Sequence, residues 1–226
     1  MSDLFGAAGP GGPGGPGSNA EGALAALRAE AASCTLCPLY IPANQTVFGE
    51  GGAAAQLMLV GEQPGDQEDV AGEPFVGPAG QVLDECLDRA GIDRSSAYVT
   101  NAVKHFKFTQ RGRRRIHEKP KVSEIDVCAQ AWLHREIEVV APDLVVCLGA
   151  SAVRGITGRS ATIKSLRSEI KPMPLGKAKD APTVTALVTV HPSYLLRIDD
   201  PAAREAETEG FIDDLRAARD YVANAA

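Results

Sequence analysis

Four short apolar runs recur along this chain, and each one stops at a glycine or at polar residues. Continuous apolar runs of this length are typical of strands that are buried on both faces of a parallel sheet. Between them lie segments long enough for helices, some alanine-rich and some amphipathic. We expect strands at residues 57–60, 98–103, 144–148 and 185–190.

Helices are expected in the segments that alternate with these strands. Ser123, with Asp126 three residues later, marks a plausible helix start. Alternation of strand and helix predicts an α/β fold, a three-layer α/β/α sandwich with a central four-stranded parallel sheet. The expected helices cover residues 21–32, 80–90, 123–140, a segment after Gly149, and 202–222.

A length of 226 residues suits one domain with a substantial core. Residues 6–17 are only Gly, Ala and Pro, and such a segment buries too little apolar surface to offset its ordering entropy. We therefore expect a disordered tail over residues 1–20 and a single domain over residues 21–226.

The composition, 44% apolar and 23% charged, is that of a soluble globular protein. No apolar stretch is long enough for a bilayer, and the N-terminus lacks the basic-then-apolar layout of a secretory signal. We expect a cytoplasmic protein without membrane association. Five cysteines without an export signal favour metal or cluster ligation over disulfides.

The cysteines at 34 and 37 form a C-x-x-C pair ahead of the first strand. Cys128 lies near an expected helix start and His105 ends the second strand, so both can approach the pair. Three cysteines and a histidine would suit zinc or an iron–sulfur cluster. The third possibility is that the C-x-x-C pair is incidental and binds no metal. Cys86 and Cys147 lie in apolar patterns and are most simply small buried side chains.

The first strand breaks into the turn Gly61-Glu62-Gln63-Pro64-Gly65, and the acidic residues Asp66, Glu68 and Asp69 follow. Ligands of open α/β sheets bind outside the carboxyl ends of the strands, so a polar turn at this position is a candidate site. The alternative is a strand followed by an acidic loop.

A basic loop, residues 106–121, follows the second strand. Together with Lys104 it has a net charge of +7 in a protein whose net charge is −6, and it also carries Phe106 and Phe108. It is either a solvated loop or a surface that binds phosphates and stacks on bases. His117 near its end is either a bystander or a catalytic group delivered to the site.

The fourth strand ends in His191-Pro192-Ser193. The histidine could merely cap a helix, or it could donate a hydrogen bond to an oxygen on which negative charge develops. No phosphate-binding G-x-x-x-x-G-K-[ST] loop and no dinucleotide fingerprint occurs in the sequence.

Jointly these segments resemble the iron–sulfur (family 4) uracil-DNA glycosylases. The matching motifs are C-x-x-C-P-L, G-E-x-P-G, G-x-P-F-V-G, N-A-V-K, V-C-L-G-A and H-P-S-Y-L-L-R, between residues 32 and 197. His105 stands where family 4 enzymes usually have cysteine, and the loop is longer, with an Arg-rich end at His117. With Gln63, these departures resemble UdgX, the group that becomes covalently attached to uracil-containing DNA.

The resemblance implies a [4Fe–4S] cluster on Cys34, Cys37, Cys128 and His105. It also implies that Phe75 stacks on an extruded uracil, that Asn101 reads its Watson–Crick edge, and that His191 contacts a base carbonyl. Glu62 and Gln63 would lie near the sugar. Further contacts to uracil or DNA are expected from Gly61, Asp66, Arg114, Arg115, Ser193 and Arg197.

On this basis we expect the protein to excise uracil from DNA, preferably single-stranded, and to act as a monomer. His117 would capture the sugar carbon before water does, because a nucleophile held near attack distance has an effective molarity of about 10⁵ M or more. Each molecule would then act once. A multiple-turnover glycosylase and a non-catalytic iron–sulfur nucleic-acid-binding module remain the alternatives. Protein partners are not indicated.

Overall fold

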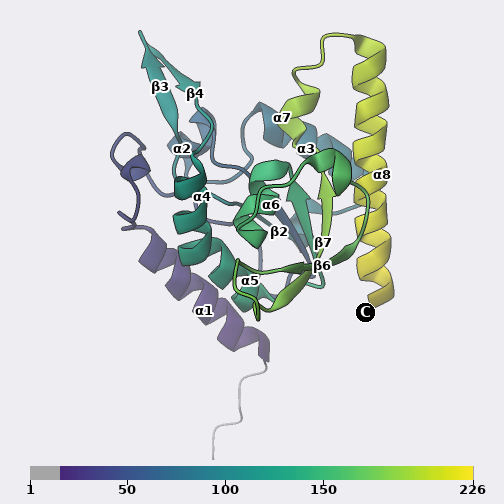
Figure 1. Cartoon of the computed structure of the whole chain (residues 1–226), viewed down its shortest axis with the longest axis horizontal. Helices are drawn as coiled ribbons and strands as arrows, with labels where there is room; N and C mark the ends of the chain where they lie inside the picture. The colour runs from purple at the N-terminus through teal and green to yellow at the C-terminus, as the bar shows by residue number, and fades with distance from the viewer. Residues whose placement is uncertain (1–15, 226) are drawn as a thin grey trace, which may run out of the picture.

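The computed structural model describes the backbone of residues 16–225 and the side chains of residues 19–225. Helix α1 covers Pro16–Ala31, so it begins five residues before the predicted start (Figure 1). Residues 1–15 of the predicted tail lie outside the described residues. Among the described helices, none combines the length and the apolar character needed to span a bilayer.

The central sheet has five strands in the order β2-β1-β5-β7-β6. Four of them are parallel and correspond to the four predicted strands, which confirms the predicted α/β fold. The fifth, β6, was not predicted and pairs antiparallel with β7 at the edge of the sheet. The strands are β1 (Leu57–Gly61), β2 (Ala97–Asn101), β5 (Leu144–Leu148), β6 (Lys171–Pro174) and β7 (Thr183–Thr189).

Helices cover both faces of this sheet (Figure 1). Alternate side chains of β5 enter two separate apolar clusters: Val145 and Cys147 join one, and Val146 joins the other. Burial on both faces explains why the strand is a continuous apolar run. One face carries α1, α4 (Val122–Cys128), α5 (His134–Val140) and α6 (Ala150–Thr157), and the other carries α3 (Pro78–Ala90), α7 (Pro192–Leu195) and α8 (Pro201–Ala225).

The helix predicted over residues 123–140 is one helical run with a π-helical segment, Ala129–Leu133, between α4 and α5. Such segments are frequent at functional sites. Here it begins directly after Cys128 and contains Trp132, whose indole N–H donates to Cys34 Sγ. The second strand ends at Asn101, two residues earlier than predicted.

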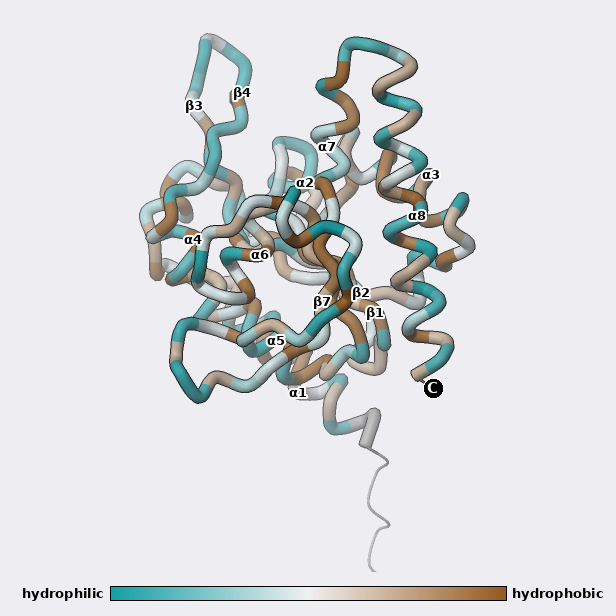
Figure 2. Tube along the Cα trace, turned by 45° about the vertical axis from the view of Figure 1, so that its right-hand side comes forward, coloured by the Kyte–Doolittle hydropathy of each residue, from teal (hydrophilic) through white to brown (hydrophobic). Residues whose placement is uncertain are grey.

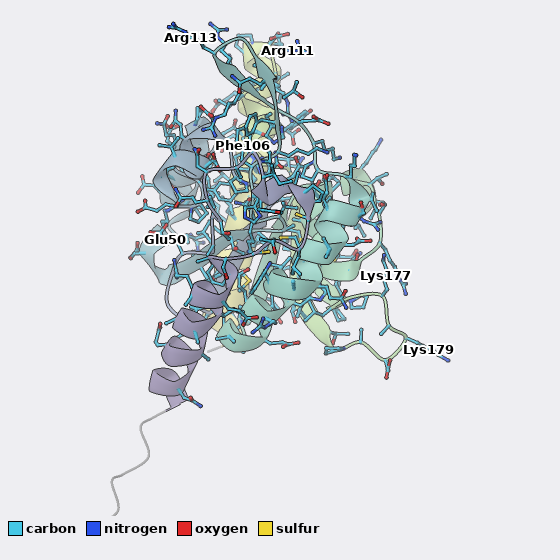
Figure 3. All side chains as sticks on the ribbon, turned by 90° about the vertical axis from the view of Figure 1, so that its left-hand side faces the viewer. Glu50, Phe106, Arg111, Arg113, Lys177 and Lys179 are labelled. Atoms are coloured by element: carbon cyan, nitrogen blue, oxygen red, sulfur yellow. The ribbon has the colours of Figure 1, made fainter. Side chains whose placement is uncertain are left out.

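The predicted basic loop is instead an antiparallel hairpin of β3 (Phe108–Arg111) and β4 (Arg114–His117). It projects from the body of the protein (Figure 1), and its tip is hydrophilic (Figure 2). Arg111 and Arg113 point outward at this tip (Figure 3). The acidic residues after the first strand are also regular, since they form the short helix α2 (Asp66–Ala71).

Candidate active site at the carboxyl edge of the sheet

A cleft of about 1300 Å³ opens at the carboxyl ends of the parallel strands. Residues at the end of β2 and just after β1, β5 and β7 contribute to its walls because the carboxyl ends of parallel strands meet at one edge of a sheet. It therefore brings together residues that lie far apart in the sequence. Its lining includes Glu62, Gln63, Asp66, Phe75, Asn101, His117, Ser151, His191, Ser193 and Arg197.

Gly61 lets two other predicted site residues approach one another. A Cβ atom at this position would lie 2.4 Å from Asn101 Oδ1 and 2.5 Å from the ring of Phe75. Asn101 is 2% exposed, and its Oδ1 has no hydrogen-bond partner among the described residues. Phe75 has a positive φ of 58°, a conformation that is rare for a bulky residue, and its ring stacks on His191. The cleft thus contains an aromatic face beside a free buried acceptor.

His191 caps the N-terminus of α7, which is one of the two roles predicted for it. Its Nδ1 accepts a hydrogen bond from the Ser193 backbone N–H at 3.2 Å and lies 2.9 Å from the Ser193 hydroxyl. Burial, together with the nearby positive charge of Arg197, lowers the pKa of His191 to about 4. The neutral ring therefore carries its proton on Nε2, where it is free to donate.

His117 ends β4 and overhangs the cleft, with its side chain 51% exposed. Its Nε2 lies 3.7 Å from Glu62 Oε1. The other carboxylate oxygen of Glu62 accepts a hydrogen bond from the hydroxyl of Ser151. The structure thus brings together His117 and Glu62, two of the three predicted catalytic residues, although they lie 55 positions apart in the sequence.

Gln63 holds the base of the hairpin. Its amide nitrogen donates to the carbonyls of Lys107 and Glu118, both at 3.2 Å, and its amide oxygen accepts from the Lys107 backbone N–H. It is only 7% exposed. The amide that we expected near the sugar therefore bridges the two ends of the hairpin that carries His117.

Arg115 was expected to contact DNA, but its guanidinium is already engaged within the protein. It forms ion pairs with Asp66 and with the fully buried Asp69. It also lies over the rings of Phe106 and Phe108, which stack on each other. Phe106 is 1% exposed, so the expectation that it could stack on a base is wrong. This cluster fastens the hairpin to α2.

The remaining predicted contacts differ in how accessible they are. Arg114 is exposed on the hairpin, and Arg197 is exposed at the rim of the cleft. Asp66 also lines the cleft, where its carboxylate faces Arg115. Arg114 and Arg197 are therefore the predicted cations that can reach a phosphate.

Cys34, Cys37 and Cys128 are all buried in the same apolar cluster. Two of their sulfur atoms accept hydrogen bonds at 3.2 Å, Cys34 from the indole of Trp132 and Cys128 from the backbone N–H of Lys104. Burial raises the pKa of Cys128 to about 12, and the other two cysteines are close enough to add to this shift. The fold thus brings Cys128 to the C-x-x-C pair from a distant part of the chain.

His105 is 3% exposed; its Nε2 lies 2.9 Å from the hydroxyl of Thr46, whereas its Nδ1 is buried without a partner among the described residues. Within residues 16–225, no three His, Cys, Asp or Glu side chains are grouped as the ligands of a single metal ion. The unpartnered Nδ1 of His105 and the sulfur atoms of Cys34 and Cys128, which accept N–H donors, fit a metal cluster in which each ligand binds a different metal atom.

Two cysteines and one histidine lie outside this set. Cys86 and Cys147 are buried as predicted, and burial raises their pKa values to about 11 and about 12. His134 was expected to be solvated, but it is half-buried and its Nε2 lies 2.8 Å from the carbonyl oxygen of Gly155.

Comparison with known proteins agrees with this arrangement. The profile described as "Uracil DNA glycosylase superfamily" matches residues 48–216. This chain belongs to that superfamily. A type-4 uracil-DNA glycosylase of Thermotoga maritima is 35% identical over 190 residues, which cover 83% of this chain and 88% of that protein. The type-4 enzyme of Pyrobaculum aerophilum is 34% identical over 171 residues, covering 74% of this chain and 81% of that protein.

In this member of the uracil-DNA glycosylase superfamily, sequence reasoning missed two residues that support the cleft. Ser151 contacts Glu62, and Asp69 contacts Arg115. The only sequence signal for Ser151 is that it follows a strand end, two residues after Gly149. Asp69 belonged to the acidic cluster that was noted after the first strand, but nothing identified its partner.

Proposed function

We propose that this protein excises uracil from DNA and that His117 then captures the exposed sugar as a covalent adduct, so that each molecule acts once. The relatives named type-4 uracil-DNA glycosylases support the first part. The observation that carries the second is the histidine itself, whose ring overhangs the cleft 3.7 Å from Glu62. The resemblance to the UdgX group through Gln63, His105 and His117 points the same way.

Base recognition follows from the groups at the bottom of the cleft. A uracil presents a donor at N3 and an acceptor at O4, and the side-chain amide of Asn101 offers the complementary pair. Its Oδ1 is buried and unpartnered among the described residues, and such an acceptor is costly to leave empty. The ring of Phe75 supplies a stacking face. A uracil in a single strand avoids the few kcal/mol needed to flip a base out of a duplex, so we propose single-stranded DNA as the preferred substrate.

Cleavage of the glycosidic bond requires stabilisation of the departing uracil as an anion. The neutral His191 donates from Nε2 because the Ser193 backbone N–H occupies its Nδ1. A pre-oriented donor in a partly buried cleft stabilises developing charge more than water does. As the bond stretches, the sugar acquires positive charge, which the carboxylate of Glu62 stabilises.

Capture depends on how firmly His117 is held. Gln63 bridges the base of its hairpin and Arg115 fastens β4 to α2. An imidazole held in this way can reach an effective molarity of about 10⁵ M or more, against roughly 55 M for water. A lone pair of the ring forms the bond to the anomeric carbon, and the electrons of the broken bond leave with uracil.

We propose that Cys34, Cys37, Cys128 and His105 hold a [4Fe–4S] cluster. The ligands of such a cluster each bind a different iron, and thus stand further apart than those of one zinc ion. The buried Nδ1 of His105 has no partner among the described residues, and the sulfurs of Cys34 and Cys128 accept N–H donors, as cluster-bound sulfurs commonly do. When bound, the cluster would hold together the 34–37 loop, the residues after β2 and the end of α4. We propose that its role is structural, because breaking a glycosidic bond needs no redox step.

DNA would be held by phosphate contacts at the rim. Arg111, Arg113 and Arg114 are exposed on the hairpin, and Arg197 lies at the mouth of the cleft. Neutralising phosphates releases counterions, so affinity should fall steeply with salt. All these groups come from one chain, and we therefore expect a monomer to suffice.

The deciding experiment mixes the protein with a single-stranded oligonucleotide that contains one uracil and runs a denaturing gel. We expect a band resistant to heat and detergent, with one uracil released per protein. His117→Gly should lose the band, whereas Gln110→Gly, an exposed position on the same hairpin, should keep it. Catalytic turnover to free abasic DNA would overturn the capture and leave a multiple-turnover glycosylase, the alternative with which the type-4 relatives are equally consistent. No release of uracil at all would leave a non-catalytic nucleic-acid-binding module.

A further inference from the structure

Ser151 contacts the site on the side of Glu62 that faces away from His117. It lies in the first turn of α6, is 5% exposed, and donates its hydroxyl hydrogen to Glu62 Oε2. The other oxygen, Oε1, is the one that lies 3.7 Å from His117 Nε2. The three side chains thus form one series, from a buried hydroxyl through a carboxylate to an imidazole.

The backbone holds Ser151 firmly in this position. Helix α6 follows β5 after the single residue Gly149, whose φ of 92° favours glycine. A Cβ atom at Gly149 would lie 3.3 Å from His191 Cβ, so this turn also packs against the base-contacting histidine. The serine is therefore carried by the rigid junction of a central strand and a helix.

We propose that Ser151 is a positioning residue for the covalent step, acting through Glu62 on His117. This inference rests on the proposed capture by His117. The final torsion of a glutamate side chain is broad and nearly two-fold, so a carboxylate in an open cleft rotates easily. A charge-assisted hydrogen bond to one oxygen removes that freedom and directs the other oxygen toward the imidazole.

The atoms and charges of the step define what Glu62 must do. A nitrogen lone pair of neutral His117 forms the bond to the sugar carbon, and the carbon–nitrogen bond to uracil breaks. Uracil leaves with the electron pair as an anion and takes a proton from water. The imidazole becomes a cation because its other nitrogen still carries hydrogen. A correctly oriented carboxylate stabilises this cation and then accepts its proton.

This role predicts an effect on the outcome of the reaction as well as on its rate. Without Ser151, the carboxylate of Glu62 still neutralises positive charge in the cleft, so uracil should still be released. His117 would be less well oriented at the moment of bond cleavage, and water would capture more of the sugar. The fraction of DNA converted to adduct, divided by the fraction converted to free abasic DNA, therefore reports on Ser151.

The test compares Ser151→Ala, Ser151→Thr and the control Ser160→Ala, whose hydroxyl accepts from Arg154 outside the cleft. Under single-turnover conditions we expect Ser151→Ala to slow adduct formation at least about tenfold, as for the loss of a hydrogen bond to a charged group, and to raise the share of free abasic DNA. Ser151→Thr keeps the hydroxyl and should restore adduct formation. Ser160→Ala should match the wild type.

A second comparison uses Glu62→Gln. If Ser151 acts through Glu62, Ser151→Ala should have little further effect in the Glu62→Gln background. The inference would be overturned if Ser151→Ala slowed adduct formation equally in the wild-type and Glu62→Gln proteins. It would also be overturned if Ser151→Ala reduced uracil release and adduct formation to the same extent and lowered the Tm, because that pattern indicates a general loss of structure. A wild-type protein that releases uracil without forming any adduct would overturn the proposed capture and, with it, the role of Ser151.

Discussion

Lys104→Met tests the most deeply buried ion pair of the described residues. The ammonium of Lys104 is fully buried and contacts the Glu136 carboxylate, the Thr100 hydroxyl at 2.6 Å and the Asn101 carbonyl at 2.9 Å. Methionine has nearly the same length but no charge and no donors. The variant therefore leaves the carboxylate of Glu136 buried without its cation, beside the residue proposed to read the base.

The expected loss of stability is large because the remaining charge has no access to water. Glu136 is 0% exposed and also accepts hydrogen bonds from Gly49 N–H and Tyr98 OH. Removing one partner of a buried pair typically costs about 3–5 kcal/mol. That is a large share of the roughly 5–15 kcal/mol that stabilises a native domain. With an m-value of about 2 kcal/mol/M, the urea midpoint should fall by about 2 M.

The assay is urea unfolding followed by circular dichroism at matched iron content. The control is the double variant Lys104→Met/Glu136→Gln, which removes both charges but keeps an acceptor for Gly49 and Tyr98. We expect it to recover at least half of the loss, because no uncompensated charge remains. The reasoning would be refuted if Lys104→Met lowered the free energy of unfolding by less than about 1 kcal/mol. It would also be refuted if the double variant lost as much stability as Lys104→Met and Glu136→Gln lose together when each is measured alone.

Three further predictions concern the hairpin, the histidine and the cysteines. Gln63→Ala removes three hydrogen bonds at the hairpin base and should slow adduct formation more than about tenfold. Gln110→Ala near the exposed tip should leave the rate unchanged. Equal rates of adduct formation for the two variants on the denaturing gel would contradict the proposal that Gln63 holds the hairpin in place. Because the pKa of His191 is lowered to about 4, the neutral donor persists as pH falls from 7 to 5, so single-turnover uracil release should not lose this donor until the pH nears 4. Stability should nevertheless fall as pH drops from about 6.5 toward 4, since the unfolded chain binds this proton first; a loss of uracil release that follows protonation of His191 near pH 6.5 in an NMR titration would contradict this assignment. Cys128→Ser should lower the iron content and the Tm, whereas Cys86→Ser, also at a buried position, should leave the iron content unchanged. An iron content in Cys128→Ser equal to that in Cys86→Ser would exclude Cys128 as a ligand.

The parallel strands could be predicted because their physical requirement is local. A strand covered by helices on both faces needs apolar side chains at every position, and 144–148 therefore matches β5 at both ends. The edge strand β6 was missed because its sequence, Lys-Pro-Met-Pro, contains two prolines and no apolar run. An edge strand tolerates proline, but nothing in four such residues predicts pairing.

The residues that line the site could likewise be predicted from the sequence, whereas the contacts that support them could not. Glu62 and His191 follow predicted strands and Asn101 lies near the end of one, and the carboxyl ends of parallel strands meet at one edge. The partners of Glu62 and Arg115 lie 89 and 46 positions away in the sequence. Their pairing depends on the strand order β2-β1-β5-β7 and on how the hairpin folds back over α2.

Local patterns in the sequence were therefore enough to predict which side chains reach the edge of the sheet, because such patterns set the strands and the residues at their ends. Three features depended on the tertiary structure: which oxygen of Glu62 faces His117, the bridging of the hairpin by Gln63, and the pairing of Arg115 with Asp66 and Asp69. These outcomes follow from long-range packing, in which a side chain takes whatever partner the fold brings within hydrogen-bond distance.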